Sequence, residues 1–443
     1  MSSPKISLLT ATSVVIANMI GTGVFTSLGF QLLGIESPFA ILCLWLLGGL
    51  IAYCGALCYS ELGASLPRSG GEYNFLTYIF HPLPGFLSGW VSATVGFAAP
   101  VALAGIALGK YSAGFLPGTN PNLIAVITIV LITLVHLYSM KAGSRFQNIF
   151  TISKVLLICL FILVGFMVEN PVNTQFLPLV NDANPKADWR MVFSGAFAIS
   201  LVWVSYSYSG WNAAAYIAGD MENPKTNIPK ALLRGTLVVT ALYVLLNMVF
   251  LWTTPTNMLA GQVEVGFVAA SQIFGLTGGK WMALLISFFL VSSISSMIIA
   301  GPRVSVSMGE DNQALQWLAK KSAGGVPINA ILLQSGITLF LVLTATFEQV
   351  LTYVGFTLNL FTFATVLGAM VLRKKEPELN RPYKIPYYPL PPLIFLALNG
   401  WMLVFLMTQK PFESLLGLIT LALGTLFYYL GKNNSGAKKQ GAH

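Results

Sequence analysis

The sequence predicts an all-α integral membrane protein with twelve transmembrane helices. Of its 443 residues, 55% are hydrophobic and only 9% are charged, whereas a typical soluble domain has about 25% charged residues. The mean hydropathy is +0.74. Many apolar runs reach the roughly 20 residues that a helix needs to cross a bilayer. Lys and Arg residues also gather in alternate connections between these runs, which is typical of multi-pass membrane proteins.

The apolar runs define the predicted spans. In chain order they cover residues 8–33, 38–63, 84–113, 121–140, 146–168, 191–217, 229–254, 280–304, 328–347, 350–372, 386–408 and 412–431. The first run is long enough to span the bilayer and follows a short polar N-terminus, so we read it as a span and not as a cleavable signal peptide.

The positive charge predicts the orientation of the chain. With the N-terminus in the cytoplasm, 18 of the 24 Lys and Arg residues fall on the cytoplasmic side and Lys154 falls within a span. The outer side then holds Lys110, Lys186, Arg190, Lys280 and Lys410. Both termini are therefore expected in the cytoplasm of a cell inner or plasma membrane. The net charge of +9 is a topology signal, so no nucleic-acid partner is expected.

The sequence offers no set of residues for metal binding, a cofactor or an enzyme mechanism. Cys43, Cys54, Cys58 and Cys159 all lie within apolar runs, where cysteine is commonly a small packing residue. His136 lacks a Cys, Asp or His partner at metal-binding spacing. No nucleophile–base set, phosphate-binding loop or dinucleotide fingerprint is present. We expect no cofactor, no metal and no enzymatic activity.

Two predicted spans contain matched interruptions. MIGTGVF, Met19 to Phe25, lies in the first span, and VSYSYSGWN, Val204 to Asn212, lies in the sixth. They are five spans apart, so the two helices enter the membrane from opposite sides. Interrupted helices at matching places in two inverted halves point to a transport site near the bilayer midplane. The alternative is that Gly21 and Gly23 only allow close helix packing.

Unwound backbone within a span can recognise a zwitterion without charged side chains. Glycine destabilises a helix interior by about 1 kcal/mol relative to alanine, which makes unwinding easier here. Free N–H groups at the start of a half-helix suit a carboxylate. Free carbonyls at the end of the other half-helix suit an ammonium group.

Four motifs then resemble those of a known family. They are GTGVF at 21–25, YSELGASLPRSGGEYNFL at 59–76, YSGWNAAAYIAGDMENPKTNIPKAL at 208–232 and IAGPRVSVSMGEDN at 299–312. Together they resemble the amino acid–polyamine–organocation superfamily, and most closely its L-type amino acid transporter branch in bacterial form. The resemblance covers nearly the whole chain.

The resemblance implies a LeuT-like fold with two inverted repeats of five helices and two additional helices. The first repeat would be 1–168, the second 191–372, and the added spans 384–431, followed by a cytoplasmic tail at 432–443. It also implies alternating access to a central amino-acid site.

The family's site residues carry over by position. The substrate carboxylate would bind the backbone around Ile20, Gly21, Thr22 and Gly23. The amino group would bind the backbone at Tyr206, Ser207 and Ser209. Tyr206 stands where the family places a closing aromatic, often Phe or Trp, and so would be the gate. Asn18 would touch the substrate side chain.

The charges within the spans indicate a neutral substrate. No Asp or Glu lies near the middle of a span, and Glu61 and Glu72 lie at or beyond the cytoplasmic end of the second span. A cationic side chain would need a buried carboxylate or an aromatic cage, and an acidic one would need an Arg. We expect neutral amino acids, including small ones, as substrates.

Lys154 is the one charge within a span. A rise of 1.5 Å per residue places it roughly 12 Å into the membrane, where an ammonium needs a partner or must reach back to the interface. The resemblance implies that sodium-coupled relatives bind the ion between the first and eighth spans, and that sodium-independent relatives carry a lysine at this position of the fifth span. Lys154 would therefore replace sodium and donate to the carbonyls of the first span. Exchange or facilitated transport is therefore the first expectation for the transport mechanism. Proton symport is the alternative, because burial favours the neutral amine.

A channel and an amino-acid sensor are the alternative function classes. A channel would need a polar lining or charged rings, and an amino-acid sensor commonly adds large soluble tails. Animal relatives pair with a single-span subunit through a cysteine between the third and fourth spans. That loop, Leu116 to Asn122, has no cysteine. We expect no disulfide-linked ancillary subunit, and the lipid bilayer as the surrounding partner.

Overall fold

The structure is a computed structural model that describes residues 6–138, 144–169, 171–172, 176, 187–322 and 325–440. For 144–149, 187 and 432–440 only the backbone is described. Within these ranges every regular element is a helix, and the sole β contact is a bridge between Ile6 and Met221. This confirms the prediction of an all-α protein.

The first half of the chain forms ten elements. They are α1 (Leu8–Met19), α2 (Gly23–Gln31), α3 (Pro38–Ser65), α4 (Glu72–Ile79), α5 (Pro82–Val91), the π-helix η1 (Ser92–Gly96), α6 (Ala98–Phe115), α7 (Pro121–Tyr138), α8 (Ser144–Phe166) and α9 (Ala187–Val192).

The second half begins with a further broken helix. Its elements are α10 (Gly195–Ser207), α11 (Ala213–Tyr216), η2 (Ala218–Asp220), α12 (Pro224–Thr253), α13 (Thr256–Leu259), α14 (Val265–Asp311), η3 (Gln313–Leu318), α15 (Ile328–Thr344), α16 (Phe347–Lys375), α17 (Leu390–Gln409) and α18 (Pro411–Gln440).

Nine helices of the described chain are long and apolar enough to cross a membrane, by length and composition. Three shorter apolar helices, Phe150–Phe166, Gly195–Ser207 and Ile328–Thr344, accompany them. The structure differs from the expected spans in detail. The eighth predicted span is part of a longer α14, in which Gly275 has non-helical angles. Helix α18 continues to Gln440, into the segment expected as a tail.

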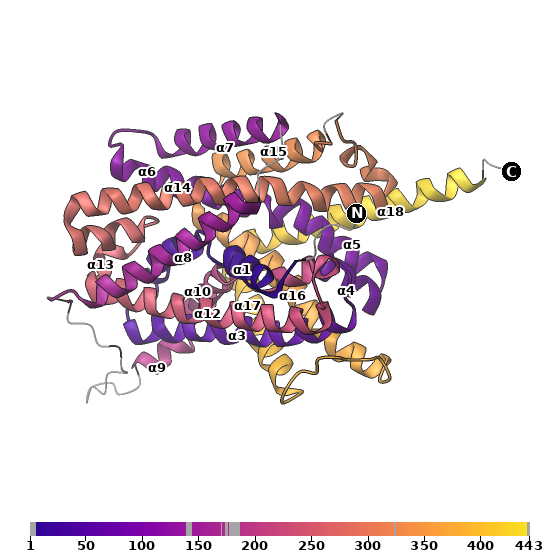
Figure 1. The fold of residues 1–443 in the computed structure, drawn as a ribbon, viewed down its shortest axis with the longest axis horizontal. Coiled ribbons are helices and arrows are strands. Elements are labelled where there is room, and N and C mark those ends of the chain that lie inside the picture. The colour runs from indigo at the N-terminus through magenta and orange to yellow at the C-terminus, as the bar shows by residue number, and fades with distance from the viewer. Residues whose placement is uncertain are drawn as a thin grey trace.

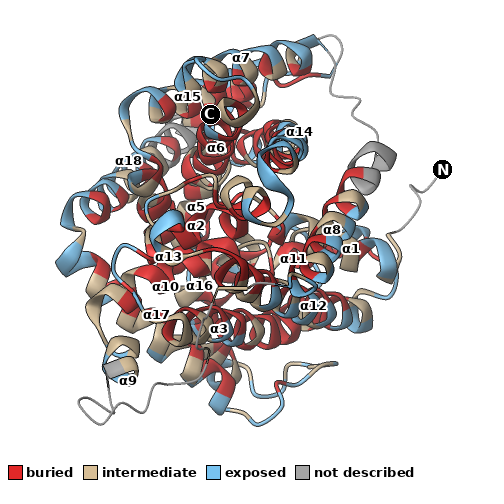
Figure 2. Ribbon diagram, turned by 90° about the vertical axis from the view of Figure 1, so that its left-hand side faces the viewer, coloured by how far each residue is buried: buried red, intermediate tan, exposed pale blue. Residues whose placement is uncertain are grey.

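The long helices run roughly side by side along the longest axis of the molecule (Figure 1). Helix α4 and the C-terminus lie at one end, and α9 and α13 lie at the other. Seen from the end, buried residues gather around α2, α10 and α16, while exposed residues lie on outer helices such as α7 and α18 (Figure 2). The outer face of α7 is apolar, with Leu131, Leu134 and Val135 more than half exposed. An exposed apolar face of this kind fits a lipid environment.

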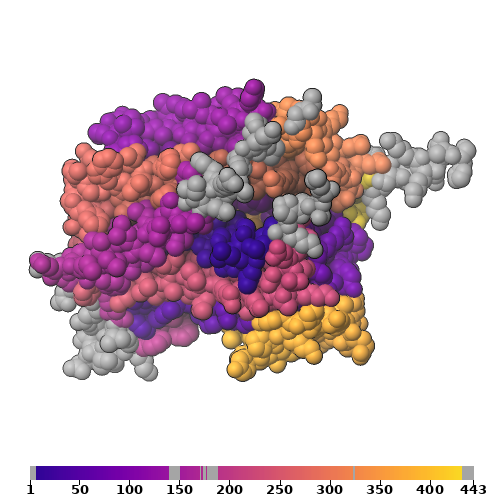
Figure 3. All heavy atoms as spheres, in the orientation of Figure 1, coloured from indigo at the N-terminus to yellow at the C-terminus, as the bar shows by residue number. Residues whose placement is uncertain are grey.

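Helix α1 lies at the surface between α8 and α12 in the space-filling view (Figure 3). Its partner α2 is almost entirely buried. The break between them therefore leads from the surface of the bundle into its centre.

Candidate functional site

The first helix break lies between α1 and α2. Helix α1 ends at Met19, and Ile20 leaves the helical region with φ −75° and ψ 84°. The Gly21 N–H turns back to the Met19 carbonyl at 2.8 Å. Helix α2 then starts at Gly23, and the side chain of its N-cap residue Thr22 does not cap it. The first turn of a helix has N–H groups without intrahelical partners, so this start presents donors.

The second break lies between α10 and α11. Helix α10 ends at Ser207, and the chain turns through Gly210, whose φ is +98°. An added Cβ at Gly210 would lie 2.7 Å from the Asn18 carbonyl carbon. Glycine is required here both by its positive φ and by the close approach to α1.

The two breaks touch each other. An added Cβ at Gly23 would lie 2.3 Å from Ser207 Oγ and 2.7 Å from Ser207 Cα. The hydroxyls of Ser27 and Ser207 are 3.3 Å apart. The start of α2 therefore packs directly on the end of α10.

Tyr243 of α12 connects the two breaks through its hydroxyl. This oxygen lies 2.6 Å from the Met19 carbonyl and 3.1 Å from the Ser207 carbonyl, the last residues of α1 and α10. Its side chain is fully buried. Carbonyls at a helix end need donors from outside the helix, and the single O–H of Tyr243 is within reach of the carbonyls at both ends, with the Met19 carbonyl the nearer. No local sequence signal distinguishes Tyr243 from the other aromatic residues of the apolar spans.

Tyr206 lies beside the first break. Its side chain is buried, and its hydroxyl lies near the Thr22 side chain. Thr22 is itself buried, and its carbonyl accepts a hydrogen bond from the Thr26 hydroxyl at 2.9 Å. The proposed gate residue thus contacts the segment expected to hold the carboxylate.

Lys154 points into the bundle from α8. Its side chain is 7% exposed, and Nζ donates to Ser293 Oγ of α14 at 2.6 Å. The opposite face of α8 is an exposed apolar stripe formed by Ile152, Leu156, Leu160 and Leu163. The lysine is therefore on the inner face of α8, and its hydrogen-bond partner is Ser293 of α14, not a carbonyl of the first span.

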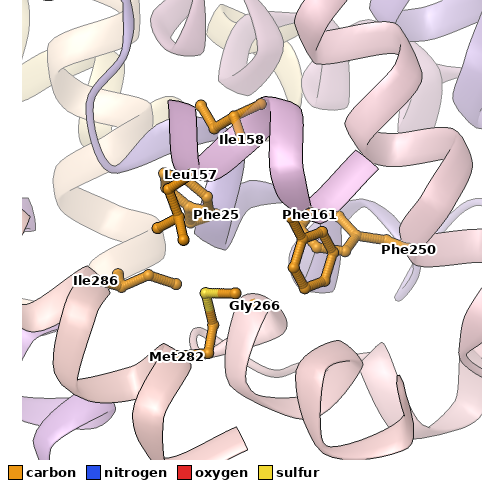
Figure 4. A pocket seen from close by; sticks show the side chains of 8 residues that line it. All are labelled: Phe25, Leu157, Ile158, Phe161, Phe250, Gly266, Met282 and Ile286. Atoms are coloured by element: carbon orange, nitrogen blue, oxygen red, sulfur yellow. The ribbon is translucent and has the colours of Figure 1, made fainter. Parts of the chain in front are cut away.

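A small cavity adjoins the first break. Ile20, Gly21, Lys154 and Ser293 line it together with apolar residues of α14, and it has room for about one water molecule. Beside it is a second small pocket lined by apolar side chains, among them Phe25, Phe161 and Ile286 (Figure 4). Gly21 has no atom within 4 Å of an added Cβ, so the break is open on this side.

The two remaining predicted residues, Asn18 and Ser209, lie at the breaks and make hydrogen bonds within their own segments. The Asn18 amide donates to the Val14 carbonyl at 2.8 Å, within its own helix. The Ser209 N–H donates to the Tyr206 carbonyl at 2.8 Å and closes the turn after α10. Among the described residues, no group of three or more His, Cys, Asp or Glu could hold a metal ion.

Comparison with known proteins places the chain among transporters. Residues 6–428 match the model of a family described as amino acid permease. The b(0,+)-type amino acid transporter 1 of Mus musculus is 28% identical over 440 residues, covering 96% of this chain and 87% of the relative. The Large neutral amino acids transporter small subunit 2 of Rattus norvegicus is 28% identical over 435 residues, covering 96% and 80%. The Asc-type amino acid transporter 1 of Mus musculus is also 28% identical, covering 96% and 81%.

Proposed function

The chain belongs to the amino acid permease family, and from that premise we propose that it transports neutral amino acids without sodium, by alternating access, as an exchanger. The names of its relatives describe transport of amino acids. The single observation that carries the finer proposal is the contact between the two helix breaks at Gly23 and Ser207.

The helix ends at this contact have the polarity that a zwitterion needs. The backbone of Ile20, Gly21, Thr22 and Gly23 would bind the carboxylate, because the start of α2 carries free N–H groups and the positive end of the helix dipole. The backbone of Tyr206, Ser207 and Ser209 would bind the ammonium group through carbonyls at the end of α10. Tyr206 would close over the substrate, and Asn18 would border its side chain.

The charges around the breaks support a neutral substrate side chain. The buried carboxylates of the described chain are Glu61, Glu72 and Glu413. Glu61 pairs with Arg373 and Arg381, and Glu72 accepts hydrogen bonds from Tyr59 and Asn212. A cationic substrate would need an unengaged carboxylate at the breaks, and an acidic one would need an arginine there.

Lys154 supports the proposal of sodium independence. Its buried ammonium lies between α8 and α14, next to Ile20 and Gly21 in the same cavity. A fixed positive charge at this place would repel a cation and satisfy oxygen atoms that an ion would otherwise coordinate. A titrating Lys154 would instead carry a proton, which is the symport alternative.

The architecture that we propose follows from the two breaks. Twelve spans would form two inverted repeats, 1–168 and 191–372, with 384–431 added and both termini in the cytoplasm. The end of the bundle that holds α4 would then face the cytoplasm. No disulfide-linked ancillary subunit would be required.

Uptake of labelled alanine into proteoliposomes tests the function. Exchange predicts flux that requires unlabelled amino acid inside, ignores sodium and is insensitive to a pH gradient. Flux into empty vesicles that follows an inward proton gradient would establish symport and make Lys154 the first candidate carrier. Flux that requires sodium would overturn the role given to Lys154.

A further inference from the structure

Glu72 at the start of α4 is the centre of a polar cluster that the proposed binding site does not use. Its side chain is buried, at 4% exposure. Its carboxylate accepts a hydrogen bond from the Tyr59 hydroxyl at 2.8 Å and from the Asn212 amide at 2.6 Å. It accepts a third from the Tyr216 hydroxyl. The three donors shown are neutral and come from α3 and from the segment between α10 and the end of α11.

A carboxylate suits this position better than any other side chain of similar size. An ionised carboxylate only accepts hydrogen bonds and has room for all three donors. An amide would turn an N–H group toward at least one of them. Hydrogen bonds to a charged acceptor are about twice as strong as those between neutral groups, and removing a charged partner leaves buried donors unsatisfied. The cluster is therefore a strong attachment between α4 and α11.

The loop before α4 extends this attachment. The Gly219 N–H donates to Ser69 Oγ at 3.0 Å. Gly71 has φ +52°, and an added Cβ there would lie 2.8 Å from the Tyr216 ring. Ser69, Gly71 and Glu72 thus hold one continuous stretch of chain from Asn212 to Gly219.

Other residues of α4 hold different helices. The Tyr73 hydroxyl donates to Asp311 Oδ2 at 2.8 Å, at the end of α14. Lys375 Nζ donates to the Ile79 carbonyl at 2.9 Å, at the end of α16. Helix α4 therefore joins the inner half of the broken helix α10–α11 to the ends of α14 and α16.

The segment after α11 also carries the start of α1. The Ile6 N–H donates to the Asp220 carbonyl at 2.8 Å, and the Glu222 N–H donates to the Ile6 carbonyl at 3.0 Å. Whatever holds α11 at this end of the bundle consequently holds the beginning of the other broken helix as well.

We propose that Glu72 is a positioning residue that latches the α4 end of the transporter closed, by fixing α11 and the start of α1 to α4, α14 and α16. The inference rests on the proposed alternating access. Opening this end would require the Asn212 and Tyr216 hydrogen bonds to Glu72 to break together, while the Tyr59 hydroxyl holds the carboxylate from α3. The strength of the latch would set how often this end opens.

The test is a pair of spin labels on the purified full-length chain in nanodiscs. Cysteines at the exposed positions Asp220 and Ser307, after replacement of the four native cysteines, place one label beyond α11 and one on α14. Glu72→Gln should raise the ratio of long to short label distances by about tenfold, because one charge-assisted bond is lost and one donor is left unpaired. Tyr216→Phe should shift the ratio in the same direction by less.

Glu222→Gln is the matched control. It makes the same chemical change at an exposed residue that follows α11 and η2 closely in the chain. It should leave the distance distribution unchanged. Distances that are equal in Glu72→Gln, Tyr216→Phe and the unsubstituted chain would overturn the latch. If Glu72→Gln yields no folded protein, the label distances in Tyr216→Phe alone decide whether the latch exists. The label distances need no transported substrate, so they test the latch separately from alanine uptake into vesicles of the same preparation, which tests the proposed function.

Discussion

Gly23 packs against Ser207 so tightly that an added Cβ at position 23 would lie 2.7 Å from the Ser207 backbone. Two residues 184 positions apart thus bring the start of α2 onto the end of α10. Because the close atoms include backbone, a rotamer change alone cannot relieve the contact.

Gly23→Ala should therefore separate the two helix breaks. Overpacking of a buried contact typically destabilises by about 1–3 kcal/mol, so we expect alanine affinity to fall by about tenfold or more, and Gly23→Leu to abolish binding. Isothermal titration of the purified protein measures this. Gly336→Ala, at a helical glycine with no atom within 4 Å of an added Cβ, should bind normally. Unaltered affinity in Gly23→Leu would refute the site assignment.

Tyr243→Phe should weaken the link between the ends of α1 and α10. It removes the hydroxyl next to the Met19 and Ser207 carbonyls while keeping the ring. A hydrogen bond contributes about 1 kcal/mol, so the rate of exchange should fall by about five- to tenfold. Initial uptake rates compare it with Tyr429→Phe, whose ring is half exposed on α18. Equal loss in both variants would argue against a specific role for Tyr243.

Lys154→Met should impair transport without reducing the yield of folded protein. Methionine keeps much of the side-chain volume but lacks the ammonium that donates to Ser293. Bonds to charged groups contribute about 1.5–3 kcal/mol, so uptake should fall by at least about tenfold. Ser293→Ala should show a smaller decrease. Lys280→Met, at an exposed lysine of α14, is the control. Wild-type flux in Lys154→Met would contradict a role of its ammonium in transport and would favour a lysine that only snorkels.

Tyr206→Ala should slow closure over the substrate, because it removes the ring beside Thr22. Tyr206→Phe keeps the ring and should retain most of the activity. Steady-state uptake should show a rise in KM together with a fall in maximal rate for the alanine variant. Normal kinetics in Tyr206→Ala would contradict the gate role.

The sequence allowed both helix breaks to be predicted because glycine and serine clusters are local signals. Gly21, Gly23 and Gly210 mark positions where a regular helix is unfavourable, and the breaks occur beside them. The sequence also predicts that the Lys154 side chain points into the bundle, because a cation on a lipid-facing surface is unfavourable.

The residues that contact these positions could not be predicted from the sequence. Tyr243 is one aromatic residue in an apolar span, and nothing nearby in sequence distinguishes it from a packing residue. Its contacts with Met19 and Ser207 depend on the rotation of α12 about its axis and on its position along α1. The sequence likewise places Glu72 only at or beyond the end of a span, because the contact of α4 with Tyr216 arises from tertiary packing. Tertiary packing also decides that Lys154 donates to Ser293 and not to the carbonyls expected from the sequence.

The junction of α2 with α10 has a consequence for how this protein can change over generations. The groups that meet there belong to the main chain, which every amino-acid sequence shares. Mutation can alter the shape and lining around them, but it cannot exchange one main-chain amide for a different chemical group. Descendants of this chain can acquire new preferences among side chains while the feature common to all amino acids stays recognised.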